Sequence, residues 1–429
     1  MKTRREFLRS TLLGASATWT VPMFVERTFA DLHLGARDLA TQAVTGKDDT
    51  ILVVLQMAGG NDGLNTLVPF ADDAYHKARP RLAKRENELI RLGDQVGLNG
   101  SMPFLGELFD QGDLAVVQGV GYPNPNRSHF VSTSVWETGD PATRSNTGWI
   151  GRYFDNACAG ADPTVGISLN KTQPESFGAL HNPGVCLSSP ELYRWIHGGQ
   201  GSAEEFFEAL NSPGDAVDGA SIDEPPVGKV GGVAGESNLA FLERVAMDAR
   251  VSSKKILEIA ARHRSGVEYG GTPIARSLNM VARMIAGGMP TRVYYVSHGG
   301  FDTHNQQINS HDRLLGQLDG ALKAFFADLR KQGNAERVVL MTFSEFGRRV
   351  SENASAGTDH GKASCLFVAG AGVKGGLFGK QPSLTDLDAG DLRHSVDFRS
   401  VYATVLEGWL RAKSEPVLKG AYAKLGFLG

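Results

Sequence analysis

The chain has few cysteines, no basic excess and, after its N-terminal region, no long apolar run. Its three cysteines, Cys158, Cys186 and Cys365, are far apart. They show neither a disulfide framework nor paired metal-ligand spacing, although one disulfide stays open. The formal net charge is -3, which argues against a nucleic-acid partner, because such proteins are basic. No later segment reaches the roughly 18 apolar residues that span a bilayer. We therefore expect a soluble mature protein with no nucleic-acid partner and no stable membrane span.

The N-terminus carries a targeting pattern. Residues 3–9 read TRREFLR, a moderately apolar stretch follows from 12 to 25, and small residues end it near Ala30. This order predicts a twin-arginine signal peptide over residues 1–30, read by the twin-arginine translocase, and a periplasmic or otherwise exported location. A basic N-terminus on a surface helix is the alternative. Removing residues 1–30 takes away five basic and two acidic side chains, so the net charge falls from -3 to about -6.

Short apolar runs alternate with helical periods along the rest of the chain. The runs cover 51–57, 114–117, 292–296, 337–343 and 365–369, and helical spacing covers 238–263, 273–286, 308–330 and 396–411. This alternation predicts a three-layer α/β/α fold with a mostly parallel, doubly wound sheet. Ligands bind such sheets at the carboxyl ends of the strands. We therefore look for chemistry in the loops that follow the strands.

Three regions of the chain differ in character. Residues 31–49 are polar and predict a lead-in segment, and residues 50–429 predict one α/β domain. Residues 211–236 are rich in Gly, Pro, Asp and Ser, a composition that buries little surface and predicts a flexible loop. We expect this loop to belong to an inserted cap over about 140–270.

Groups that bind hard metals gather near the expected strand ends. Carboxylates and imidazoles are the ligands of zinc, manganese and iron sites. The candidates are Asp62, Asp302, His304, Glu345, Asp359 and His360. Alternatives stay open for four of them: Asp62 or the 359–361 segment, with Asp359 and His360, could shape a turn, and Glu345 could pair with Arg348 or Arg349 on a helix. Asp397, before the last helix, is better explained as a helix cap.

Ser128 follows an expected strand and a Pro/Asn-rich loop, and it could open a helix. Its hydroxyl would then lie near free backbone N–H groups that favour an anionic substrate. An ordinary serine N-cap is the structural alternative.

With these residues in view, the chain resembles the alkaline phosphatase superfamily. More narrowly, it resembles an uncharacterised family of twin-arginine-exported bacterial proteins within that superfamily. The narrower resemblance runs from about residue 50 to the end, on the segments 57–64 (MAGGNDGL), 127–130 (RSHF), 299–304 (GGFDTH), 344–348 (SEFGR) and 358–361 (TDHG). The superfamily implies a two-metal site that hydrolyses phosphate or sulfate esters.

The resemblance assigns roles by order along the chain. Asp62 falls at the aspartate that binds metal after the first strand, and Ser128 at the nucleophile that opens a helix. Asp302 and His304 fall where an aspartate and a histidine share one metal. Glu345 falls at a metal-binding Asp-His pair, and His360 at the last metal histidine.

The chain also departs from the superfamily. Glu345-Phe346 stands where Asp-His is usual, so one ligand of the second metal is missing, and no Cys/Ser-x-Pro-x-Arg motif marks a sulfatase. The site could hold one ion, use Asp359 as a substitute, or be degenerate. We expect an exported hydrolase of a small anionic ester, with phosphate preferred. Its cofactor would be one or two divalent ions, with zinc first and manganese, calcium or iron as alternatives. Arg348 or Arg127 would neutralise the ester oxygens. The alternative is a non-catalytic binding or scaffold protein.

Overall fold

A computed structural model describes residues 50–142, 145–187, 256 and 258–429. The expected signal peptide, the lead-in segment, the loop over 211–236 and nearly all of the helix expected over 238–263 lie outside the described residues.

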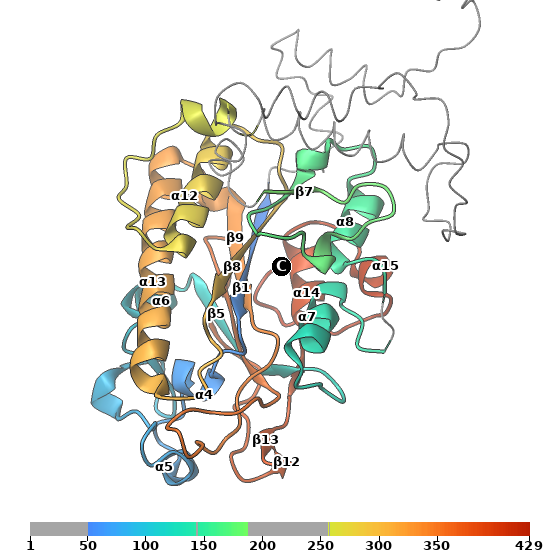
Figure 1. The fold of residues 1–429 in the computed structure, drawn as a ribbon. Helices are drawn as coiled ribbons and strands as arrows, with labels where there is room; N and C mark the ends of the chain where they lie inside the picture. The colour runs from blue at the N-terminus through green and yellow to red at the C-terminus, as the bar shows by residue number, and fades with distance from the viewer. Residues whose placement is uncertain (1–49, 143–144, 188–255, 257) are drawn as a thin grey trace, which may run out of the picture.

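A nine-stranded sheet forms the centre of the molecule (Figure 1). Its strand order is β11-β5-β10-β9-β1-β8-β6-β7, and β14 pairs with β5. All the pairings are parallel except those that β10 makes with β5 and β9. The predicted mostly parallel sheet is therefore confirmed, with one reversed strand. The strands run β1 Ile51–Ala58, β5 Leu114–Gly121, β6 Gly166–Ser168, β7 Val185–Cys186, β8 Val293–Gly299, β9 Val338–Phe343, β10 Ser364–Ala369, β11 Gly376–Phe378 and β14 Val396–Asp397.

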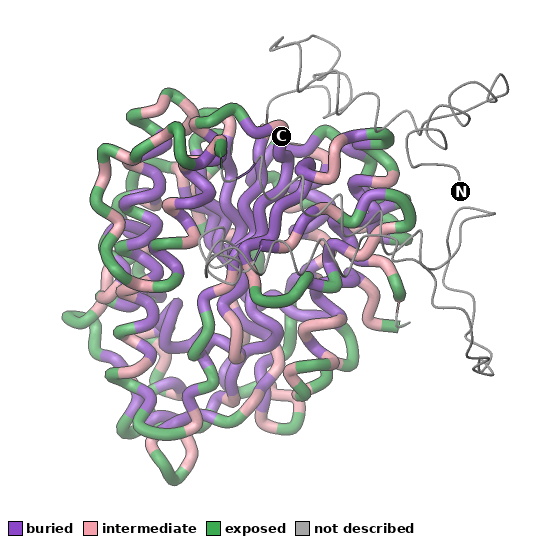
Figure 2. The backbone as a smooth tube through the Cα atoms, turned by 45° about the horizontal axis from the view of Figure 1, so that its top comes forward, coloured by how far each residue is buried: buried purple, intermediate pink, exposed green. Residues whose placement is uncertain are grey.

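The sheet forms because its strands are apolar on both faces. In β1, Val53 and Leu55 point into one hydrophobic cluster, whereas Leu52 and Val54 point into the other. Side chains alternate across a strand, so a nearly continuous apolar run fits a sheet that is covered on both sides. Figure 2 shows the buried strands at the centre of the molecule.

Helices cover both faces and complete the three layers. In Figure 1, α6, α12 and α13 lie on one side of the sheet, and α7, α8, α14 and α15 lie on the other. The helices expected over 273–286, 308–330 and 396–411 are confirmed within a few residues. The bounds are α6 Pro103–Gln111, α7 His129–Thr138, α8 Trp149–Ala157, α12 Pro273–Ala286, α13 Gln307–Gln332, α14 Phe398–Gly408 and α15 Ser414–Leu418. Asp397 caps α14 by accepting a hydrogen bond from the Arg399 backbone N–H, as predicted.

Smaller elements complete the described part of the chain. Two of them are a three-stranded sheet of order β2-β4-β3 and the β12–β13 hairpin. Their bounds, with the short helices, are α4 Gly63–Thr66, β2 Leu67–Val68, α5 Asp73–Ala78, η1 Glu86–Glu88, β3 Leu89–Arg91, β4 Gly97–Asn99, η2 Pro163–Val165, η3 Glu175–Phe177, η4 Ala335–Arg337, β12 Leu387–Asp388 and β13 Asp391–Leu392.

The described part of the expected cap belongs to the main sheet. Residues 145–187 contribute α8 and the strands β6 and β7, which extend the sheet beyond β8. The inserted cap expected over about 140–270 stays a prediction. Among the described helices, none is long and apolar enough to cross a bilayer.

Candidate metal centre

Four polar side chains converge at one edge of the sheet. Asp302 and His304 follow the carboxyl end of β8, His129 is the first residue of α7, and His360 precedes β10. Because β10 is reversed, its amino end lies at the edge where the other strands have their carboxyl ends. Residues before β10 and residues after β8 therefore meet.

The donor atoms of this cluster are close together. His304 Nε2 lies 2.9 Å from His360 Nε2 and 3.0 Å from Asp302 Oδ1, and His360 Nε2 lies 3.1 Å from the same oxygen. His129 Nε2 approaches the other oxygen, Asp302 Oδ2, at 3.6 Å. One donor atom from each of His129, Asp302 and His360 also lies within 4.8 Å of the others. Ligands bound to one zinc ion at about 2.0–2.1 Å must lie within about 4 Å of each other, a limit that the contacts among Asp302, His304 and His360 and the contact of His129 with Asp302 meet.

Each histidine is held from outside by an oxygen atom on its other ring nitrogen. His129 Nδ1 lies 2.8 Å from Glu345 Oε1, and His360 Nδ1 lies 2.9 Å from the Arg127 carbonyl oxygen. His304 Nδ1 lies 3.4 Å from Asp359 Oδ1. Metal-binding histidines commonly have an outer carboxylate or carbonyl of this kind, which fixes the ring and its tautomer.

The outer oxygens decide which nitrogen faces inward. They only accept hydrogen bonds, so each neutral ring keeps its proton on Nδ1 and turns a bare Nε2 inward. The inward set is then three imidazole nitrogens and a carboxylate, which repel one another. A cation among them would offset this repulsion, and zinc, iron and manganese accept such ligands. The residues present therefore fit a divalent metal ion.

Asp302 is ionised and partly open to solvent. Burial raises its pKa, but the hydrogen bond and the charge of Arg348 outweigh this effect and lower the pKa to about 2. The side chains of Asp302 and His304 are 46% and 42% exposed. A small molecule can therefore reach the cluster from solvent.

Arg348 is buried beneath the cluster. Its Nη2 donates to Asp302 Oδ1 at 2.7 Å, and its remaining contacts are with the carbonyl oxygens of Gly59, Gly60, Phe301 and Thr358. The backbone of Asp302 can lie close to that of residue 59 because residue 59 is glycine. A Cβ atom there would come 2.5 Å from the Asp302 nitrogen. We had predicted that Arg348 binds substrate oxygens. In the structure its guanidinium is buried and holds Asp302 instead.

Glu345 and Phe346 lie beside the cluster and contact its histidines. Glu345 is buried, and its Oε1 accepts from the Gly59 backbone N–H at 2.9 Å as well as holding His129. It does not lie on a helix or pair with Arg348 or Arg349, which was the structural alternative. The ring centre of Phe346 lies 4.9 Å from that of His129 and 4.6 Å from that of His360. This aromatic contact fills the space beside the cluster.

Asp62 lies apart from the four converging side chains. It is fully buried, and its Oδ2 accepts from Arg79 Nη1 at 2.6 Å and from Gln307 Nε2 at 2.5 Å. Its Oδ1 accepts from the Leu64 backbone N–H and caps α4, whereas the structural alternative in the sequence was a turn. Burial raises the pKa of Asp62, but the charge and hydrogen bond of Arg79 bring it below its usual value. A guanidinium thus stands beside Asp62, where we had expected a metal ion.

Ser128 and Arg127 border the cluster. Ser128 is exposed at the N-cap of α7, and within the described residues its hydroxyl makes no capping hydrogen bond. Arg127 holds His360 through its carbonyl group, and its guanidinium pairs with the buried carboxylate of Asp391 while remaining 38% exposed. Asp359 supports His304, and a hydrogen bond from Asn353 helps to lower its pKa. Ser128 thus directly precedes His129 in the chain, and Arg127 contacts His360 through its carbonyl group.

The sequence patterns did not indicate His129 as a candidate metal ligand. The motif 127–130 was recognised, but Ser128 drew attention because it matched a nucleophile. The available signal was a histidine in the first turn of a helix after β5, which lies in the same sheet as β8. Two other histidines in this region are structural: buried His298 contacts the Leu314 carbonyl, and buried His311 contacts the side chain of Asn61.

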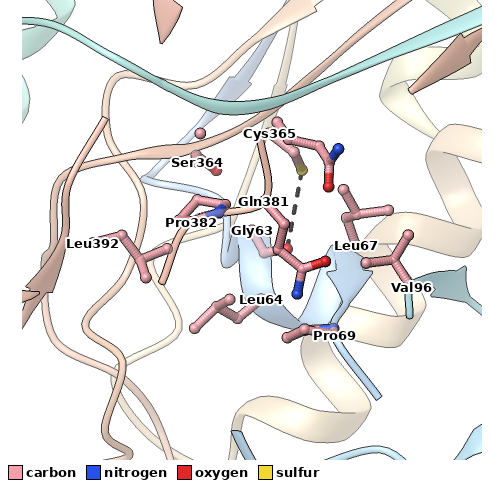
Figure 3. Close-up of a pocket in the computed structure, with 12 residues that line it drawn as sticks. Gly63, Leu64, Leu67, Pro69, Val96, Ser364, Cys365, Gln381, Pro382 and Leu392 are labelled. Atoms are coloured by element: carbon pink, nitrogen blue, oxygen red, sulfur yellow. Dashed lines mark hydrogen bonds between the residues drawn. The ribbon is translucent and has the colours of Figure 1, made fainter. Parts of the chain in front are cut away.

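A separate small pocket lies between α4, β10 and residues 381–392 (Figure 3). It is lined mostly by apolar or small residues, among them Leu64, Leu67 and Cys365. Burial raises the pKa of the Cys365 thiol to about 12, so this group stays protonated. All three cysteines are unpaired.

Comparisons with known proteins give a family of unassigned activity and distant structural likenesses. Residues 243–409 match a family described as "Protein of unknown function (DUF1501)". No curated protein matches the chain. The sulfatase PsFucS1 from Pseudoalteromonas sp. is 10% identical, with a TM-score of 0.38 and coverage of 95% of this chain and 76% of that one. The alkaline phosphatase from the Antarctic bacterium TAB5 is 9% identical, with a TM-score of 0.29 and coverage of 76% and 94%. At these scores we draw nothing about activity from the likeness.

Proposed function

We propose that the protein is a hydrolase of small anionic esters, with phosphate preferred, that uses a single divalent metal ion. The observation that carries this proposal is the inward convergence of His129, His304 and His360 on Asp302, with each outer ring nitrogen held by an oxygen. Such a set would bind an ion through four side chains. The exposure of Asp302 and His304 leaves one side for substrate.

The proposal assigns a separate task to each neighbouring residue. When bound, a divalent ion polarises an ester oxygen and favours deprotonation of a nearby hydroxyl or water. Ser128 Oγ would form a bond to phosphorus as the ester P–O bond breaks, and the serine proton would leave with the alcohol. A water molecule would then release phosphate and regenerate Ser128. The exposed face of the Arg127 guanidinium would neutralise the non-bridging oxygens.

Two features support one ion rather than two. Phe346 packs its ring against His129 and His360 at the position where the superfamily would supply a second-metal histidine. Asp62, the other expected ligand, is paired with Arg79 in the interior. The buried guanidinium therefore provides the positive charge that a second ion would otherwise bring to this carboxylate.

Turnover by the purified chain tests this function. The metal-stripped protein would be reloaded with zinc, manganese, iron or calcium and assayed on phosphomonoesters, phosphodiesters and sulfate esters. Ser128→Ala should lower kcat by at least about 100-fold, because a lost nucleophile removes the covalent step. Ser134→Ala is the matched control, since its hydroxyl on the same helix contacts Glu175. Metal binding without turnover on any ester would favour the alternative, a non-catalytic binding protein.

We also propose that the chain is exported folded, on the basis of residues 3–9. The translocase recognises the arginine pair, so Arg4→Lys with Arg5→Lys should retain the protein in the cytoplasm. Fractionation of cells that express both forms measures this directly. An unchanged exported yield, either in the double variant or in cells without the translocase, would refute the proposal.

A further inference from the structure

The two loops that carry the metal-binding side chains are bonded to each other along their backbones. Gln306 N–H donates to the Ser355 carbonyl at 3.0 Å, and Gln307 N–H donates to the Ala356 carbonyl at 2.9 Å. Thr358 N–H donates to the Thr303 carbonyl at 3.2 Å. Segment 302–307, with Asp302 and His304, and segment 353–360, with His360, thus form one unit.

This close approach has local requirements. A Cβ atom at Gly357 would lie 2.2 Å from the His304 carbonyl carbon, so only glycine fits there without movement. Gln306 has a φ of 39°, in the left-handed region that is unfavourable for a side chain larger than glycine. Strain of this kind persists only where surrounding contacts hold it.

The Gln307 side chain lies between these two loops and the interior. It is 0% exposed. Its Oε1 accepts from Thr303 Oγ1 at 3.1 Å and from Thr358 Oγ1 at 2.6 Å. Its Nε2 donates to Asp62 Oδ2 at 2.5 Å. One amide thereby contacts both metal-binding loops and the segment after β1.

The direction of these hydrogen bonds follows from Arg79. Because Arg79 keeps Asp62 ionised, the carboxylate can only accept, so the Gln307 nitrogen must face it. The Gln307 oxygen must then face Thr303 and Thr358, and both hydroxyl groups must donate. Arg79 itself is anchored to the carbonyl oxygens of Arg349 and Val350 at 2.8 Å each. The buried charge pair thus fixes the orientation of the whole network.

We propose that Gln307 is a positioning residue for the metal centre: it holds the Asp302–His304 loop and the His360 loop at the separation that one ion needs. Arg79 and Asp62 fix the orientation of the Gln307 amide. This inference rests on the proposed metal site and adds that Asp62, expected as a ligand, acts through Gln307. Thr303 lies between Asp302 and His304 in the chain, and Thr358 lies two residues before His360, so each hydroxyl is close to a ligand.

The test compares Gln307→Met with Gln317→Met, a change of the same size at a partly exposed glutamine on the same helix. Methionine keeps the length of the side chain and removes all three hydrogen bonds. The full chain would be titrated with Co²⁺, and its dissociation constant and visible spectrum measured. Removing an outer partner of a metal site weakens affinity by about 10–100-fold, so we expect at least about 10-fold for Gln307→Met. We expect no change for Gln317→Met.

A second readout needs no metal. In the apo protein, hydrogen exchange should rise in both 302–307 and 353–360 in Gln307→Met and in neither segment in Gln317→Met. Thr358→Val removes a single donor, and its effect on Co²⁺ affinity should be smaller and not additive with that of Gln307→Met, because the two share one hydrogen bond. If Gln307→Met fails to fold, Thr358→Val can take its place in both measurements.

The outcomes separate this inference from the proposed function. If the wild-type protein binds Co²⁺ and Gln307→Met binds it equally well, with unchanged exchange in both segments, Gln307 has no positioning role and the metal centre stands. If the wild-type protein binds no Co²⁺, the proposed metal function fails. Exchange in the two segments then still decides whether Gln307 holds the loops together.

Discussion

Two carboxylates lie near the same edge of the sheet, and each contacts a buried arginine. Asp302 accepts from Arg348, yet it is 46% exposed and faces three imidazoles. Asp62 accepts from Arg79 with both side chains at 0% exposure, and its remaining contacts are a backbone N–H and an amide. Asp302 therefore keeps a side open to solvent, whereas Asp62 is enclosed by groups that donate hydrogen bonds to it. The comparison shows that residue type and order do not decide which aspartate can bind metal.

The histidines of the two regions differ in the same way. His360 is held on Nδ1 by a backbone carbonyl and presents Nε2 to Asp302. His311 is buried, and its Nε2 contacts Asn61 Oδ1 at 2.9 Å. Burial lowers the pKa of His311 to about 4, so this ring is neutral at ordinary pH. It belongs to the interior network and not to the cluster.

Removing a histidine of the cluster should have the largest effect. His360→Ala deletes a ligand and should weaken Co²⁺ or Zn²⁺ binding by more than about 100-fold, since losing an outer partner alone costs 10–100-fold. Calorimetric titration measures this change. His181→Ala, at an exposed loop histidine, is the control. Equal metal affinities of His360→Ala and His181→Ala would mean that His360 does not bind an ion.

Asp62→Asn should instead act on stability. It leaves Arg79 buried without its charge partner, a change that costs about 3–5 kcal/mol in the free energy of unfolding. Chemical denaturation of the metal-free protein measures this cost. If the apo variant is as stable as the wild-type protein while metal binding is lost, Asp62 is a ligand after all.

The Asp62–Arg79 pair also predicts that the free energy of unfolding depends on pH. The folded pKa of Asp62 lies below its usual value, so its contribution is present above the unfolded pKa of about 3.9 and is lost as pH falls toward the folded pKa. Unfolding free energies of the apo wild-type protein should therefore decline below about pH 4. In Asp62→Asn this acid-dependent decline should be smaller. Parallel pH profiles for the two proteins would contradict the assignment.

Glu345→Gln should lower metal affinity less than His360→Ala does, and it should lower stability less than Asp62→Asn does. The amide oxygen can still accept from the Gly59 N–H, so the fold should persist, but the charge that orients His129 is lost. We expect metal affinity to fall by about 10–100-fold, as for other outer carboxylates, with the melting temperature nearly unchanged. An unaltered affinity would mean that His129 does not bind the ion.

Much of the fold could be predicted because its signals are local. The local apolar pattern alone is enough to recognise the strands β1, β8 and β9 and the three- and four-residue steps of α13. The reversal of β10 could not be predicted, because a strand that is buried on both faces reads the same in either direction. That reversal brings His360 to the site from before its strand.

The site was predictable as a set of residue types but not as a set of contacts. Carboxylates and histidines near the strand ends indicated Asp302, His304 and His360. The pairing of Asp62 with Arg79 depends on where the segment after α5 packs, and periodicity does not determine this. His129 was overlooked because its role depends on Glu345, which lies 216 residues away along the chain.

The most direct test of the central claim is a crystal structure of the metal-loaded protein with anomalous scattering at the metal edge. The account predicts one ion per chain, bound by Nε2 of His129, His304 and His360 and by Asp302 at about 2.0–2.2 Å, with Asp62 still on Arg79. Two ions with Asp62 as a ligand, or an ion bound without His129, would contradict it.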